Sequence, residues 1–144
     1  MRKFIISLFI TLLSPLAIAA VTPLPLFCPE LITCANNMTT QGCIVQGQYA
    51  ANWGAPKIAG APLIKGVYTF DSAWVKYVNG RPVTNECYFI NKTSSVRYLS
   101  VSNKARPGFV AVPLSASWQK VPGREEIVKC QGTSFFQCPL LINP

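Results

Sequence analysis

Residues 66–91 have the sequence GVYTFDSAWVKYVNGRPVTNECYFIN, in which two runs of aliphatic and aromatic residues flank Asn79-Gly80. Side chains of these β-branched and aromatic types favour strands. Asn and Gly tolerate positive φ at both central positions of a type I′ turn, the tightest reversal of a twisted strand pair. The segment therefore predicts a β-hairpin, around which the rest of the chain is arranged.

The register of this hairpin is less certain than its existence. A two-residue loop places Tyr77 opposite Pro82 and, continued without interruption, Trp74 opposite Asn85. That register mixes polar and apolar side chains on both faces of the strand pair. A bulge near Asp71-Ser72, or a longer loop, would sort the two faces, so the register stays open.

Shorter β-forming runs accompany the hairpin on both sides. They occupy residues 44–49, 95–101, 114–121, 125–130 and 138–142. No segment keeps a period of 3.6 residues, and the 12 prolines argue against long helices. We predict a mostly β fold with little helix, an antiparallel β-sandwich or open barrel of five to seven strands.

Residues 1–19 have the pattern of a secretory signal peptide. A basic start, Met1-Arg2-Lys3, precedes an apolar run and the small-residue cleavage site Ala17-Ile18-Ala19. The run is short, contains Pro15 and lacks a basic stop signal, which argues against a membrane anchor. We therefore predict that residues 20–144 form a single periplasmic or extracellular domain with no transmembrane span after cleavage.

Six cysteines follow the predicted cleavage site. They are Cys28, Cys34, Cys43, Cys87, Cys130 and Cys138. An even number of cysteines in an exported chain indicates disulfides, although the sequence leaves their pairing open. Because the chain has no histidine and no pair of cysteines separated by two other residues (C-x2-C), we expect neither a metal site nor a cofactor.

The charge of the chain bears on its partners rather than on its fold. Of its 13 basic residues two, Arg2 and Lys3, precede the cleavage site, and five acidic residues oppose the rest. Such an excess attracts anionic glycans or membrane surfaces, but the charges are scattered, as on an ordinary solvated surface. The predicted partner is an anionic glycan, a membrane surface or another protein. We do not expect a nucleic acid.

Aromatic residues are the best candidates for a binding surface. Tryptophans are mostly buried, so for each of Trp53, Trp74 and Trp118 taken alone we expect a core position. Trp74 lies beside Lys76 on one strand face and is the best candidate for an exposed platform, which could stack sugars. The predicted binding residues are Trp74, Lys76, Tyr77, Arg81 and Arg106.

No complete catalytic motif is present in the sequence. A serine or cysteine nucleophile activated by histidine is excluded, because the chain has no histidine. Ser117 and Lys120 match the Ser-x-x-Lys pattern of penicillin-binding enzymes, but the companion motifs are absent. Asp71 and Glu86 lie on opposite arms of the hairpin and would have to converge for acid–base chemistry. We predict that the protein is not an enzyme.

Several short motifs in cysteine-spaced order resemble a known family. They are Cys28-Pro29, Cys34, Cys43, Tyr68-x-Phe70-x-x-Ala73, Cys87-Tyr88-Phe89, Trp118, Cys130 and Cys138-Pro139. The chain resembles a family of small exported cysteine-containing domains of Gram-negative bacteria, to which no function is assigned. The resemblance implies a periplasmic or secreted β-rich domain and supplies no catalytic residues.

These observations favour an exported, disulfide-stabilised binding module with a basic and aromatic surface. The alternative is a protein inhibitor of a secreted enzyme, which would insert the tip at residues 79–82 or 106–108. A hydrolase without a recognisable motif is the third hypothesis. Asn37 and Asn91 also begin N-glycosylation sequons, which matter only in a host that glycosylates.

Overall fold

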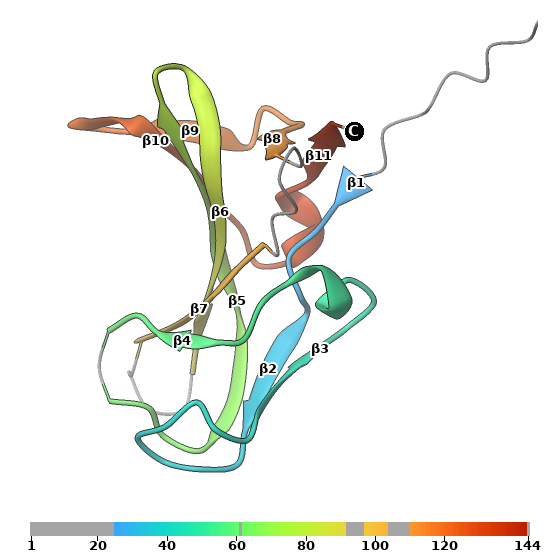
Figure 1. Cartoon of the computed structure of the whole chain (residues 1–144), viewed down its shortest axis with the longest axis vertical. Helices are drawn as coiled ribbons and strands as arrows, with labels where there is room; N and C mark the ends of the chain where they lie inside the picture. The colour runs from blue at the N-terminus through green and yellow to red at the C-terminus, as the bar shows by residue number, and fades with distance from the viewer. Residues whose placement is uncertain (1–24, 61, 92–96, 104–109, 144) are drawn as a thin grey trace, which may run out of the picture.

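The computed structural model describes residues 25–60, 62–91, 97–103 and 110–143 (Figure 1). These residues form eleven strands and two short 3-10 helices. The elements are β1 (Pro25–Leu26), β2 (Leu31–Cys34), β3 (Cys43–Gln46), η1 (Ala50–Asn52), β4 (Lys57–Ile58), β5 (Gly66–Val78), β6 (Arg81–Ile90), β7 (Arg97–Ser102), β8 (Val110–Pro113), β9 (Trp118–Val121), β10 (Arg124–Gln131), η2 (Phe135–Gln137) and β11 (Leu140–Asn143).

The strands form two antiparallel sheets, which confirms the predicted mostly β class. The larger sheet has the order β3-β2-β5-β6-β7-β4 and the smaller one the order β1-β11-β8. One end of β5 pairs with β2 and the other with β10, which in turn pairs with β9. The β2–β3 and β10–β9 pairs leave the long hairpin in different directions, so the larger sheet is curled (Figure 1).

The strands outnumber the five to seven that the sequence predicts. Four short strands, β1, β2, β4 and β8, lie outside the runs that the sequence predicts as strands. Two of them, β1 and β4, are only two residues long, and they are strands because of the partners they meet in space. The predicted strand at residues 114–121 is shorter, beginning at Trp118, and residues 95–96 lie outside the described part of the chain.

The β5–β6 hairpin has the predicted turn. Asn79 and Gly80 have φ values of 51° and 73°, the left-handed conformation that a type I′ turn requires at both positions. Tyr77 pairs with Pro82, as expected for a two-residue loop. The turn confirms that this pair of residues reverses the chain.

Two irregularities decide which side chains of the hairpin share a face. A register shift between Phe70 and Ser72 lies where a bulge was considered, and a second shift separates Lys76 from Tyr77. Because of the second shift, Trp74 pairs with Glu86. The uninterrupted register, which places Trp74 opposite Asn85, is therefore wrong by one residue. A bulge accommodates one extra residue and re-aims the side chains that follow it.

The bulges let β5 bury apolar side chains along its length on one face. Tyr68 and Phe70 are buried before the first bulge, and Ala73 and Val75 after it. They join a single buried cluster that draws on both sheets, since Leu26 and Leu140 of the smaller sheet belong to it. The core therefore lies between the two sheets. The opposite face of β5 is partly exposed at Trp74 and exposed at Lys76, while Ser72 on that face is buried.

All six cysteines form disulfides, which confirms that prediction. Cys28–Cys87 ties the segment after β1 to the middle of β6. Cys130–Cys138 ties β10 to the segment between η2 and β11, and thus links the two sheets. The third disulfide, Cys34–Cys43, joins a directly paired position of β2 and β3.

The predicted signal peptide, residues 1–19, lies outside the described residues. Within the described part of the chain, no helix has the length and apolar character needed to cross a membrane. Three disulfides are consistent with an extracytoplasmic location, because such bonds persist in oxidising compartments.

Candidate functional site

The solvent-facing side of β10, β5 and β6 carries a row of polar and aromatic side chains. Lys129 of β10 pairs with Trp74 of β5, and Trp74 pairs with Glu86 of β6. In the adjacent row, Ser72 pairs with Tyr88. Directly paired residues project from the same face of a sheet, so the register brings these side chains together.

Trp74 is the centre of this surface. Its partly buried indole lies 5.1 Å from the ring of Tyr88, measured between centroids, with the planes inclined by 52°. On β10, the Lys129 ammonium lies 5.7 Å from the centroid of the Trp74 ring. A cation at this distance is attracted by the negative face of the indole.

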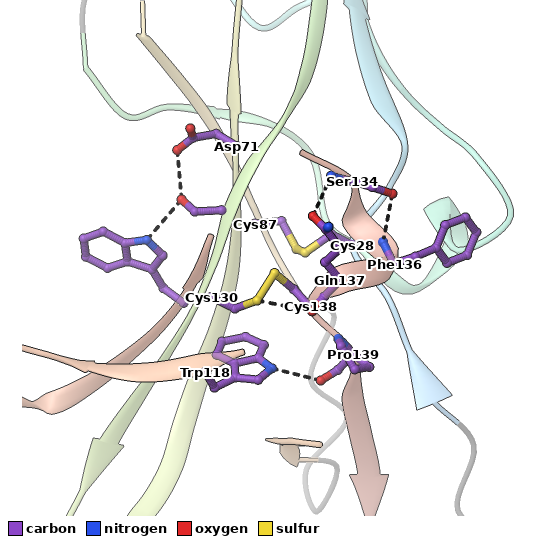
Figure 2. Close-up of a disulfide and its surroundings, with 12 residues drawn as sticks. Cys28, Asp71, Cys87, Trp118, Cys130, Ser134, Phe136, Gln137, Cys138 and Pro139 are labelled. Atoms are coloured by element: carbon purple, nitrogen blue, oxygen red, sulfur yellow. Dashed lines mark hydrogen bonds between the residues drawn. A yellow bond between two sulfur atoms is a disulfide. The ribbon is translucent and has the colours of Figure 1, made fainter. Parts of the chain in front are cut away.

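Hydrogen bonds fix the indole from the Asp71 side. Trp74 Nε1 donates to Ser72 Oγ at 3.2 Å, and Ser72 Oγ donates to Asp71 Oδ2 at 3.0 Å. Figure 2 shows Asp71 on the other side of β5 from the Cys28–Cys87 disulfide. The bulge at Asp71 thus supplies the carboxylate that begins this chain of hydrogen bonds.

A second carboxylate lies beyond Trp74. The Tyr88 hydroxyl donates to Glu86 Oε2, which holds this acid against the sheet. Partial burial raises the pKa of Tyr88 above its ordinary value, the hydrogen bond and negative charge of Glu86 raise it further, and Arg124 lowers it. Tyr88 therefore stays protonated and donates to Glu86 throughout the neutral pH range.

The surface is hollowed on both sides of the Trp74–Tyr88 pair. One depression, of about 310 Å³, is lined by both rings together with Asp71, Ser72 and Lys129. The other, of about 350 Å³, is lined by the same rings with Lys76, Glu86 and Arg124 among its walls. Each depression thus contains one carboxylate and at least one basic side chain.

These groups suit a polyhydroxylated and anionic ligand. A carboxylate has two oxygens with several lone pairs, so Asp71 and Glu86 can accept hydroxyl hydrogens besides the bonds they already receive. Lysine ammonium groups bind anionic groups through three donors. Aromatic rings supply apolar surface for the carbon–hydrogen faces of a sugar.

The structure brings together some of the predicted binding residues and separates others. Trp74 and Lys76 line the same depression. Tyr77 alternates to the opposite face, packs against the core and has its pKa raised by burial, so it does not lie on the same surface as Trp74 and Lys76. Arg81 is exposed at the tip of the hairpin, opposite Val78, and Arg106 lies outside the described residues.

The other two tryptophans have structural roles, as expected. Trp53 is 2% exposed, and its Nε1 donates to the Phe27 carbonyl oxygen at 2.9 Å. Trp118 packs against the core, and its Nε1 donates to the Pro139 carbonyl oxygen at 3.1 Å (Figure 2). Trp74 therefore differs from both, because its indole takes part in a solvent-facing cluster.

The structure also locates the residues considered for catalysis. Asp71 and Glu86 line different depressions, with Trp74 and Tyr88 shared between them. Lys120 lies on strand β9 and forms a 3.4 Å ion pair with Glu125. Ser117 and Lys120 both line a depression over β9 and β10.

Sequence reasoning missed Lys129 and Tyr88 as members of the site. Tyr88 follows from the corrected register, in which it faces Ser72 rather than lying one position away. Lys129 comes from β10, more than fifty residues beyond Trp74, and only the pairing of β10 with β5 brings it there. No local pattern in the sequence marks that pairing.

A scan against protein-family models, a search of curated proteins and a search of solved structures each found no match. The resemblance to small exported domains of Gram-negative bacteria therefore stays a prediction. Function has to be argued from the chemistry of the surface around Trp74.

Proposed function

We propose that this protein is an exported, non-enzymatic binding module that takes an acidic glycan on the surface around Trp74. The observation that carries the proposal is the contact of Trp74 with both Tyr88 and Lys129, between two depressions on a solvent-facing sheet. This surface combines aromatic rings, an ammonium group and hydrogen-bonded carboxylates, and none of these side chains belongs to the buried core cluster.

Pre-organisation supports a binding role for this surface. Trp74, Ser72 and Asp71 are joined by hydrogen bonds, and Tyr88 is bonded to Glu86. Side chains that are already ordered lose little conformational entropy when a ligand arrives. An ordered surface of this kind, with aromatic rings beside hydrogen-bonding groups, favours a ligand with many hydroxyl groups.

The distribution of charge favours an acidic glycan over an anionic lipid surface. A membrane surface attracts clustered basic side chains, whereas here Asp71 and Glu86 alternate with Lys76 and Lys129 along the face. The carboxylates would be repelled by a dense anionic surface. They can instead accept hydroxyl hydrogens of a sugar while the ammonium groups bind its acidic substituents.

Binding of the oxidised protein to immobilised polygalacturonate and alginate tests the proposal, with neutral dextran and phosphatidylglycerol vesicles as comparisons. We expect binding to the uronic-acid polymers that weakens as salt increases, because exposed charges are screened. Trp74→Ala should weaken it by about tenfold or more, the equivalent of about 1.4 kcal/mol. Phe136→Ala is the matched control, because Phe136 is an exposed aromatic residue, 57% accessible, on η2.

Two outcomes would contradict the proposal. Equal affinity of the Trp74→Ala variant and the unchanged protein would remove the surface around Trp74 from the binding site. Binding to the vesicles but to neither polymer would replace the glycan by a lipid surface.

The hairpin tip supports a second candidate, a protein inhibitor of a secreted enzyme. Val78 and Val83 are 48% and 46% exposed and flank the rigid turn at Asn79-Gly80. An apolar, pre-organised tip of this kind can enter an active-site cleft at low entropic cost. This candidate predicts a stoichiometric complex that persists at moderate salt and is abolished by Val78→Asp combined with Val83→Asp.

A further inference from the structure

A third depression adjoins the two that flank Trp74. It has a volume of about 370 Å³ and lies over β9 and β10, where Gln119, Lys120 and Gln131 contribute to its walls. Lys129 lines both this depression and the neighbouring one that contains Asp71. The three depressions are therefore consecutive, with Lys129 at one boundary and Trp74 at the next.

We propose that these depressions form one track, which binds an extended acidic oligosaccharide across β9, β10, β5 and β6 rather than a single sugar. The inference rests on the proposed function and defines the size of its ligand. The two depressions beside Trp74 follow one another along β5 from Asp71 to Lys76, which at about 3.3 Å per residue is a length of roughly 16 Å, and the third adjoins them at Lys129. One sugar ring fills only part of that length.

The positions of the basic residues indicate how the chain would be recognised. Lys76 lies in the depression at one end, and Lys129 at the boundary between the other two. Lys120 also lines the depression over β9 and β10, but it pairs with Val128, which in turn pairs with the buried Val75. The Lys120 side chain therefore projects from the opposite face of the sheet, and it forms an ion pair with Glu125.

Lys129 differs from Lys76 in having an aromatic partner on this surface. Its ammonium lies over the Trp74 ring, which favours a position beside the boundary between the two depressions that it lines. We infer that Lys129 binds an acidic group of the ligand whatever the ligand's length. Lys76 contributes only when the ligand is long enough to reach it.

Titration calorimetry with di-, tetra- and hexasaccharides of galacturonate and mannuronate tests the track. We expect affinity to rise from the disaccharide to the hexasaccharide. Lys129→Ala should weaken binding of every length, by about tenfold, as the loss of a charge-assisted contact does. Lys76→Ala should weaken binding of the hexasaccharide several-fold more than binding of the disaccharide.

Lys65→Ala is the control, because it removes the same charge from an exposed position at the far end of β5. It should change the affinity for all lengths equally and only slightly. If disaccharide and hexasaccharide bind equally well, and Lys76→Ala affects both alike, the track is wrong while the proposed function stands. If no uronic-acid polymer or oligomer binds, both the track and the proposed function fail.

Discussion

Lys129 holds its ammonium 5.7 Å from the centroid of the Trp74 ring, although the two residues lie far apart in the chain. They are direct partners in the antiparallel pairing of β10 with β5. This contact is both a stabilising interaction between strands and the centre of the proposed binding surface. Its strength can therefore be measured without knowledge of the ligand.

The first prediction concerns the energy of this contact. In a double-mutant cycle, Lys129→Met and Trp74→Leu should show a coupling energy of about 0.5–1 kcal/mol, the usual range for an exposed cation–π pair. Methionine keeps most of the length of the side chain and removes its charge. The free energy of unfolding, from urea denaturation of the four proteins, gives the coupling directly, and strictly additive losses would show that no cation–π attraction exists.

The second prediction concerns the titration of Tyr88. Its pKa is raised by burial and by Glu86, so its phenol should still be protonated at alkaline pH values where exposed tyrosines ionise. Glu86→Gln removes the negative charge and should lower the pKa of Tyr88, yet leave it above the ordinary value because burial is the larger cause. Tyrosinate absorbance against pH measures this, and Tyr88→Phe identifies the contribution of Tyr88.

The same shift has a consequence for stability. A tyrosine whose pKa is higher in the folded than in the unfolded chain stabilises the fold fully below the unfolded value of about 10, and less as pH rises above it. The free energy of unfolding should therefore fall above that pH, and fall less steeply in Tyr88→Phe. A steeper fall in the variant would reverse the sign of the shift.

The third prediction compares two disulfides. Cys28–Cys87 closes a loop with a sequence separation of 59, whereas Cys34–Cys43 closes one of 9. Chain-entropy estimates give stabilisations of roughly 4 and roughly 3 kcal/mol. Because Cys28 and Cys87 are also fully buried, the Cys28→Ala/Cys87→Ala variant should lose more stability than the Cys34→Ala/Cys43→Ala variant. Thermal and urea unfolding of both variants test this order, and the reverse order would contradict it.

The fold class and the central hairpin could be predicted from sequence because their signals are local. The turn at Asn79-Gly80 depends on two adjacent residues that tolerate positive φ, and the structure has both. The pairing of the cysteines, by contrast, depends on which segments meet in three dimensions. The sequence shows an even number of cysteines but contains no local preference that selects Cys28 for Cys87.

The site could be predicted only where it lies on one strand. Trp74 and Lys76 are two residues apart, so strand alternation alone places them on a common face. Glu86 and Tyr88 depend on a bulge that shifts the register by one residue, and one such shift moves every later side chain to the other face. Tyr77 directly follows Lys76, so the same alternation places it on the opposite face, although its residue type suits a binding surface.

The last prediction concerns a close approach between Gly132 and Gln137. The Gln137 Oε1 atom accepts from the backbone N–H groups of Thr133 and Ser134, at 2.8 and 3.2 Å, and forms part of the capping box of η2. A Cβ atom on Gly132 would lie 2.3 Å from that oxygen. Gly132→Ala should therefore displace the Gln137 side chain, break both hydrogen bonds and cost about 1–2 kcal/mol in the free energy of unfolding.

A second background separates this clash from a general effect of the substitution. In Gln137→Ala the hydrogen bonds are already absent and the oxygen is gone, so adding Gly132→Ala should cost much less than it does in the unchanged protein. Urea denaturation of the two single variants and the double variant measures the difference. Equal costs of Gly132→Ala in both backgrounds would show that Gln137 is not what requires glycine at this position, and that the backbone there is responsible instead.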